Sequence, residues 1–281
     1  MTTVAARRLT LLAFVVVMSC ARAPTVGGPS TESKPATKPR REGAAFPGFD
    51  KRDFPGLREM EIWYGSSPYE WVGYYLPAPC FAGASWAGHR QELIDRQWGL
   101  AVLYVGLQAP RSAAVNADTS RGAAAVVALE ATRCSQNTLS AAQGQTDADD
   151  AANMAAADGF PEGTTIFLDV ERAEPYPAEL DAYVRAWVSQ LLARRFTPGI
   201  YGHRTNAAAL FATQKAAYSA AGETRDPPFW VVNSQGFDLA KSPAESGFAF
   251  ATIWQNPTDA NETYGGVTFR IDRNVALKKN N

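Results

Sequence analysis

Two carboxylic acids one residue apart, Asp169 and Glu171, are the clearest chemical signal in this sequence of 281 residues. They follow the apolar run Ile-Phe-Leu at 166–168, which is typical of a buried strand. Side chains two apart on a strand project to the same side, so we expect both acids to face one cleft. Close like charges raise at least one pKa and keep that acid protonated near neutral pH. Glycosidic hydrolysis needs such an acid, together with a second group that stabilises or captures the cationic sugar carbon.

Other interpretations of these acids remain open at this point. Asp169 could cap a loop while Glu171 pairs with a base such as Arg172. A carboxylate cluster could also hold Ca²⁺ or Mg²⁺ through oxygen ligands. Phosphodiester cleavage would use two histidines as acid and base, but we expect His89 on an outer helix, far from His203. We predict no metal and no cofactor.

Composition excludes several classes of protein. Two histidines cannot build a histidine-rich metal centre, and a net charge of −1 gives no electrostatic footprint for nucleic-acid binding. The apolar fraction of 46% predicts a globular fold. What remains is a mid-sized globular domain, which we expect to be a monomer and to bind no nucleic acid.

Eight short apolar or β-branched runs predict strands, and helical patterns separate several of them. Predicted helices cover 86–98, 147–157 and 178–195, with an extra one at 122–131. Alternating strands and helices over about 240 residues predict a single (β/α)8 TIM-type barrel at 46–281. An open doubly wound sheet is the alternative, but no Gly-rich phosphate loop follows the first strand. The predicted strands are 46–50, 71–75, 100–106, 165–171, 199–202, 229–233, 250–255 and 267–272.

The carboxyl ends of such strands carry the chemistry of a barrel. Asp50 ends the first predicted strand, Tyr201 and His203 the fifth, Gln255 the seventh, and Asp272 the eighth. We expect four carboxylates at one mouth, with Asp50 and Asp272 tuning pKa values and holding sugar hydroxyls. Aromatic rings stack on the apolar faces of sugars. We predict this role for Tyr74, Tyr201, Trp230 and Trp254, and helix-to-barrel packing for Trp98 and Trp187.

A family resemblance rests on a series of short motifs in fixed order: GFD, GYYLPAPC, LAVLYVG, GTTIFLDVE, PGIYG, IWQ and RIDRN. Together they resemble a bacterial glycoside-hydrolase-like TIM-barrel domain family of unknown function. That family is distantly similar to the N-acetylmuramidase lysozymes, which cleave peptidoglycan. The resemblance covers nearly all of 46–277.

By that resemblance, Glu171 falls where the muramidases carry their proton donor. Asp169 falls on the acid that assists the sugar cation or orients its N-acetyl group. Asp50 and Asp272 match the acids of the first and last strands, and Tyr201 matches the tyrosine of the GIY motif. The sequence departs from the lysozymes after the first strand, where Lys51-Arg52-Asp53 replaces a small residue and an aromatic. It also departs at the sixth, which keeps Trp230 but ends in Asn233-Ser234.

The first twenty residues have the pattern of a bacterial export signal: Arg7 and Arg8, an apolar run from Leu9 to Met18, and Ser19-Cys20. We predict that Cys20 becomes lipidated and anchors the chain to a membrane; an ordinary cleaved signal is the alternative. Residues 21–45 are Pro-rich and without aromatics, which predicts a disordered linker. We expect the cysteines that remain after it, Cys80 and Cys134, to form a disulfide in an oxidising compartment.

Two functions follow. The first is a cell-envelope or secreted glycosidase for peptidoglycan or a related amino-sugar glycan, with Glu171 as general acid and Asp169 assisting the sugar cation. The second is a glycan-binding or structural envelope lipoprotein on the same barrel, without catalysis.

Overall fold

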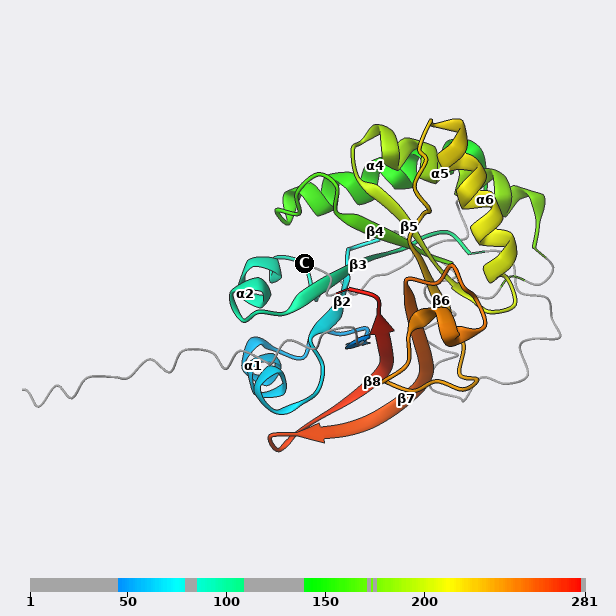
Figure 1. Cartoon of the computed structure of the whole chain (residues 1–281). Coiled ribbons are helices and arrows are strands. Elements are labelled where there is room, and N and C mark those ends of the chain that lie inside the picture. The colour runs from blue at the N-terminus through cyan, green and yellow to red at the C-terminus, as the bar shows by residue number, and fades with distance from the viewer. Residues whose placement is uncertain (1–44, 79–84, 109–138, 171–172, 174–175, 279–281) are drawn as a thin grey trace, which may run out of the picture. The chain divides into compact units, whose positions relative to one another are not determined.

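Eight strands close into a barrel in which each strand lies between its sequence neighbours, and β1 completes the ring by pairing with β8. The computed structural model describes residues 45–78, 85–108, 139–170, 173 and 176–278 (Figure 1). The chain divides into two units, Met1–Lys34 and Pro35–Asn281, and all described residues belong to the second. The strands are β1 Phe46–Asp50, β2 Trp71–Tyr75, β3 Gly99–Val105, β4 Thr165–Val170, β5 Thr197–His203, β6 Phe229–Val232, β7 Ile253–Tyr264 and β8 Val267–Ala276.

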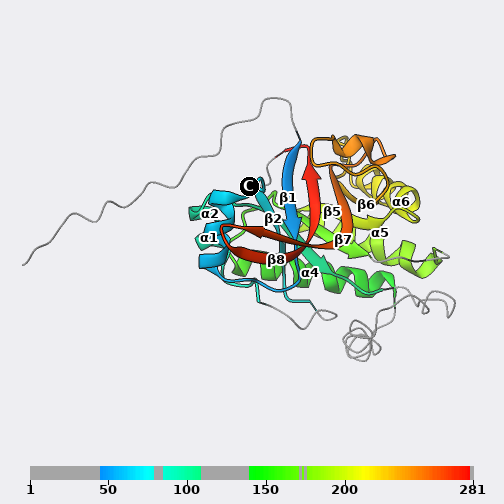
Figure 2. The same cartoon turned by 90° about the horizontal axis from the view of Figure 1, so that it is seen from below.

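The predicted barrel of strands and helices is confirmed, but the direction of the last strand differs from a regular (β/α)8 barrel. Strands β1 to β7 pair in parallel, whereas β8 is antiparallel to both β7 and β1. Figure 2 shows β1 and β8 side by side with opposite directions. β7 and β8 form a hairpin joined at Gly265-Gly266, two glycines with positive φ. Such a two-residue turn is a hairpin signal in the sequence.

Helices cover the outside of the barrel. The described helical elements are α1 Leu57–Ser66, α2 Arg90–Asp95, α4 Ala141–Ala157, α5 Ala178–Ala193, α6 Ala207–Ala220 and the short 3-10 helix η2 Pro243–Ser246. The apolar face predicted for 178–195 is confirmed, because Leu180, Val184, Trp187 and Leu191 of α5 are buried. None of the described helices is long and apolar enough to cross a membrane.

Two helix boundaries differ from the prediction for local reasons. The helix predicted at 86–98 shortens to α2, because Gly88 takes a left-handed conformation (φ 83°) two residues before it and Gln97 does so (φ 67°) two residues after it. α4 begins six residues before the predicted 147, at a cap in which the Ser140 side chain accepts a hydrogen bond from the Gln143 amide. The sequence prediction missed α1 and α6, and the helix predicted at 122–131 lies outside the described residues.

The barrel interior is filled by large side chains placed opposite glycines. Trp71, Phe167 and Trp230 lie in this inner cluster. A Cβ on Gly48 would come within 2.1 Å of the Trp71 ring, and one on Gly199 within 2.5 Å of Phe167. The glycines therefore make room for rings that plug the barrel, so that ligands can enter only above this layer. A larger cluster between barrel and helices holds Trp98 and Trp187, as predicted.

Candidate active site

A pocket of about 720 Å³ opens at the barrel end where β1, β2, β4 and β5 finish. Inward-facing strand ends supply its floor, and the β7–β8 hairpin supplies one wall. The residues lining it are Asp50, Lys51, Arg52, Asp53, Pro55, Glu59, Tyr75, Asp169, Tyr201, Asp259, Val267, Thr268, Phe269, Arg270, Ile271 and Asp272. The structure thus brings together four of the residues predicted from sequence: Asp50, Asp169, Tyr201 and Asp272.

Asp50 is held rigidly at the end of β1. Its side chain accepts hydrogen bonds from the Tyr75 hydroxyl (2.8 Å), the Gln255 amide (2.5 Å) and the Asn274 amide (2.7 Å). The residue is only 5% exposed. Burial raises the pKa of Asp50, and the three hydrogen bonds oppose that rise. Asp50 is therefore an oriented, desolvated acceptor at the base of the pocket.

A glycine on the next strand gives Asp50 its space. Gly73 faces inward from β2, and a Cβ there would lie 2.7 Å from the Asp50 Cβ and 3.0 Å from Leu103. The sequence Trp71-Val-Gly-Tyr-Tyr75 therefore leaves room for the acid at its glycine and supplies the tyrosine hydroxyl that binds it.

Asp272 lies beside Asp50, but the strand that carries it runs in the opposite direction to the one predicted. We expected Asp272 at the carboxyl end of the eighth strand. Instead β8 descends from the hairpin into the barrel, and the antiparallel register pairs Asp272 with Asp50. Burial, followed by the charge of Asp50, raises the pKa of Asp272 to about 7. The Asp259 amide, at an irregularity in β7, donates to Asp272 (2.9 Å).

Asp169 projects into the pocket from β4. It pairs in register with Val105 of β3 and Tyr201 of β5, and it is 7% exposed. The Gln108 side chain donates to the Asp169 backbone carbonyl (3.0 Å), which ties β3 to the end of β4. Glu171, Cys20, Cys80 and Cys134 lie outside the described residues, and β4 is described to Val170.

Tyr201, Gln255 and Trp230 belong to the same polar network. The Tyr201 hydroxyl donates to the side-chain carbonyl oxygen of Gln255 (2.7 Å). The Trp230 indole donates to the side-chain carbonyl oxygen of Asn274 (3.0 Å). Tyr201 lines the pocket, whereas Gln255 and Trp230 are completely buried beneath it. In this structure Gln255 and Trp230 act as supports, and Tyr201 is the member of this network that a ligand can contact.

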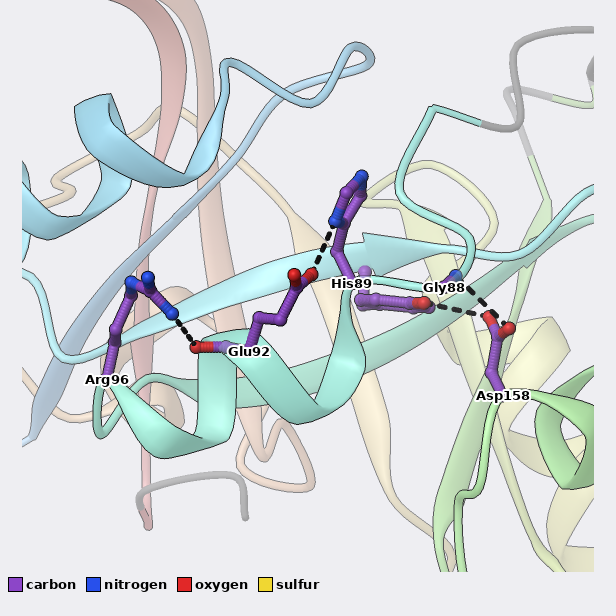
Figure 3. Close-up of polar contacts among 6 residues, drawn as sticks. Gly88, His89, Glu92, Arg96 and Asp158 are labelled. Atoms are coloured by element: carbon purple, nitrogen blue, oxygen red, sulfur yellow. Dashed lines mark hydrogen bonds and ion pairs between the residues drawn. The ribbon is translucent and has the colours of Figure 1, made fainter. Parts of the chain in front are cut away.

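Three predicted binding residues lie away from the pocket. The Tyr74 side chain belongs to the cluster between barrel and helices and donates to Asp158 (2.8 Å). Asp158 also accepts from the Gly88 amide (Figure 3). Trp254 is completely buried and donates to the Asn233 carbonyl oxygen (2.6 Å). His203 contacts Thr205 at 2.9 Å and does not line the pocket. Strand alternation is the physical reason for the first two: Tyr74 and Trp254 lie on the helix-facing side of their strands, whereas the residues that follow them, Tyr75 and Gln255, face Asp50.

A family model described as the Rv2525c-like, glycoside hydrolase-like domain matches residues 61–276. The chain belongs to this family. The match confirms the resemblance read from the motifs, and it covers the pocket residues from β2 to β8, while Asp50 precedes it.

Solved structures show that the fold of this glycoside-hydrolase-like domain is shared. An uncharacterized B. stearothermophilus protein is 18% identical, with a TM-score of 0.53 over 83% of this chain and 96% of that one. The spore cortex lytic enzyme SleM of Clostridium perfringens is 11% identical, with a TM-score of 0.50 over 83% of this chain and 67% of that one. A search of curated protein sequences found no match.

The sequence prediction missed three residues that line the pocket or support it from below. Tyr75 and Asn274 hold Asp50, and Asp259 contacts Asp272. Asn274 could have been found, since it stands two residues after Asp272 and so shares its strand face. Nothing in the sequence distinguishes Tyr75 from Tyr74, because both faces of β2 are buried.

The carboxylates of the pocket, as far as the structure describes them, are not arranged as a metal-binding site. Within the described ranges, no group of three or more His, Cys, Asp or Glu side chains is arranged to hold a metal ion. Lys51, Arg52 and Arg270 line the same pocket, and Arg270 forms an ion pair with Asp259 (2.6 Å). The pocket therefore offers acceptors on its floor and cations on its wall, an arrangement suited to a polar organic ligand.

Proposed function

We propose that this glycoside-hydrolase-like protein hydrolyses an amino-sugar glycan, peptidoglycan or a related polymer, in the pocket at the barrel mouth. The observation that carries the proposal is the convergence of Asp50, Asp169 and Asp272 with Tyr75 and Tyr201 on one pocket. Glycosidic cleavage requires two carboxyl groups, one that donates a proton and one that stabilises or captures the sugar cation. Membership of the family and the spore cortex lytic enzyme among structures of similar fold support a cell-wall glycan as the first substrate to test.

In the proposed mechanism, Glu171 is the general acid that protonates the leaving oxygen. Asp169 stabilises the cationic sugar carbon, directly or by orienting the substrate's N-acetyl group. The support for Asp169 is its position in the pocket, and the support for Glu171 is its spacing of two from Asp169 on the sequence. Asp50 and Asp272 hold sugar hydroxyls and tune the pKa values, while Tyr201 offers its ring to a sugar face.

The test is incubation with purified peptidoglycan, followed by mass analysis of the released fragments. We expect Glu171→Gln and Asp169→Asn to abolish release without a large change in melting temperature. Glu162→Gln is the matched control, because Glu162 is exposed and pairs with Arg195 rather than lining the pocket. Undiminished release by Glu171→Gln would remove the proposed mechanism.

Glycan binding without cleavage is the second candidate. It is favoured by Lys51 and Arg52, which line the pocket where the lysozymes carry a small and an aromatic residue. Burial lowers the pKa of Lys51, and the nearby Asp53 opposes that shift. Calorimetric binding of glycan fragments, with no release of reducing ends over days, would support this candidate over hydrolysis.

We also propose that the protein is exported and works at the cell envelope, anchored by lipid at Cys20, with Cys80 and Cys134 paired as a disulfide. The support is the sequence alone: the apolar run ending at Cys20 and the Pro-rich segment after it. Metabolic labelling with a fatty acid should mark the wild-type protein and not Cys20→Ser. Thiol titration after denaturation should detect no free thiol from Cys80 or Cys134.

A further inference from the structure

In the hydrogen-bond network beneath the pocket, Trp230 fixes which partner donates and which accepts. An indole N–H can only donate, so the oxygen of the Asn274 amide must face Trp230 (3.0 Å). The Asn274 nitrogen then faces Asp50 and donates to its Oδ1 (2.7 Å). Trp230 and Asn274 are both completely buried, so neither can exchange its partner for water.

The same direction continues on the other side of Asp50. Gln255 donates its side-chain nitrogen to the same Oδ1 of Asp50 (2.5 Å), which leaves its side-chain carbonyl oxygen facing Tyr201. A carbonyl oxygen cannot donate, so the hydrogen between Gln255 and Tyr201 comes from the tyrosine hydroxyl (2.7 Å). The single hydroxyl hydrogen of Tyr201 is therefore directed to the barrel interior.

Tyr75 is constrained in the same way, because its hydroxyl donates to the second oxygen of Asp50 (2.8 Å). Both tyrosines line the pocket, and both have committed their hydrogens to buried acceptors. Any hydrogen bond from either phenol oxygen to a ligand must be one in which the oxygen accepts.

We propose that Gln255 is a positioning residue, oriented by Trp230 through Asn274 and Asp50. It makes the Tyr201 hydroxyl oxygen an obligate hydrogen-bond acceptor. The pocket therefore selects a sugar that presents an N–H or O–H to this oxygen. The inference rests on the proposed glycan function and adds a specificity rule to it. Selection follows because a ligand with an acceptor at this position would place its lone pairs against those of the Tyr201 oxygen. No hydrogen bond could form, and a polar group would be left unpaired.

The experiment measures calorimetric affinity for N-acetylglucosamine oligomers and for analogues altered one group at a time. Fluorine replaces each hydroxyl, and a 2-O-acetyl group replaces the acetamide, because neither replacement can donate. We expect one altered position to weaken wild-type binding about tenfold, the loss of one hydrogen bond. The same alteration should have almost no further effect in Tyr201→Phe.

Gln255→Met tests the positioning role. With its carbonyl oxygen gone, the Tyr201 hydroxyl can turn its hydrogen into the pocket, so the penalty at that position should fall to about twofold. A purely structural role for Gln255 would weaken all analogues equally and leave the tenfold penalty intact, which would overturn the inference. If Gln255→Met does not fold, an unchanged penalty in Tyr201→Phe overturns it.

Failure of the inference and failure of the proposed function are distinguishable. Wild-type protein that binds the oligomers but tolerates every alteration overturns the acceptor rule and leaves glycan binding intact. Wild-type protein that neither binds nor cleaves any oligomer or peptidoglycan overturns both.

Discussion

Asp50 and Asp272 face each other across the antiparallel pair of β1 and β8, two carboxylates in register at the base of one pocket. A parallel eighth strand could carry an acid at the mouth only at its end. The antiparallel strand places Asp272 where β8 enters the barrel and continues to Asn274, which holds Asp50 from below. The reversal of one strand therefore supplies both a second acid and a support for the first.

The first prediction concerns pH. The pKa of Asp272 rises from its ordinary value near 3.8 to about 7 on folding, mainly through burial. Between these values the folded state binds more protons than the unfolded state, so the free energy of unfolding should fall as pH rises from about 4 to about 7. Asp272→Asn removes this titration but keeps an oxygen to accept from the Asp259 amide.

We expect Asp272→Asn to be more stable than wild type at pH 8 by about 1–3 kcal/mol, and nearly equal to it at pH 4. Urea unfolding at both pH values measures the difference. Parallel stability curves for the two proteins would show that Asp272 titrates normally in the folded state.

The second prediction concerns the space beside Asp50. Gly73→Ala places a Cβ 2.7 Å from the Asp50 Cβ and should cost about 1–3 kcal/mol, because backbone and acid must move apart. Gly65→Ala is the matched control. Gly65 lies in α1 with nothing within 4 Å, so alanine there should be neutral or stabilise by up to about 1 kcal/mol. Chemical denaturation measures the free energy of unfolding of both variants. If Gly73→Ala is as stable as Gly65→Ala, the pocket is not tightly packed at Gly73.

The third prediction concerns the hairpin wall. Trp63 of α1 donates to the Val267 carbonyl oxygen (3.0 Å) and stacks on Phe269, with ring centroids 4.1 Å apart. Both hairpin residues line the pocket, and Figure 1 shows the hairpin tip beside α1. Trp63→Ala should destabilise the protein by about 3–5 kcal/mol and weaken ligand binding.

The contrast for Trp63→Ala is Trp63→Phe, which loses the hydrogen bond but keeps an aromatic ring against Phe269. It should cost clearly less and retain most of the binding. If both variants bind ligand as tightly as wild type, the hairpin wall does not contact the ligand.

The fourth prediction separates buried from exposed polar contacts outside the pocket. Asp147 is 2% exposed and accepts from the Tyr183 hydroxyl (2.6 Å), and burial raises its pKa. Tyr183→Phe leaves that acid without one donor and should cost about 1–3 kcal/mol. Lys215→Ala breaks an exposed pair with Asp226 and should cost at most about 1 kcal/mol. Thermal melts of the two variants compare them directly; a larger loss for Lys215→Ala would contradict this ranking.

Local sequence patterns were enough to predict the strands of the barrel and to place Asp169 at its mouth. The runs LAVLYVG and TIFLDVE are apolar over a length that suits strands buried on both sides, and this pattern is local, so it can be read without the rest of the chain. Once β4 was located, alternation and the barrel rule placed Asp169 at the mouth.

Contacts between distant parts of the chain, by contrast, determine which tyrosine of β2 enters the pocket and which residues hold Asp50. Tyr74 and Tyr75 lie on a strand buried on both faces, so no polar side marks which way it is turned. The bonds from Gln255 and Asn274 to Asp50 join residues 205 and 224 positions apart. They exist because the barrel closes β8 against β1, and contacts made by closure leave no periodic trace in the segments that form them.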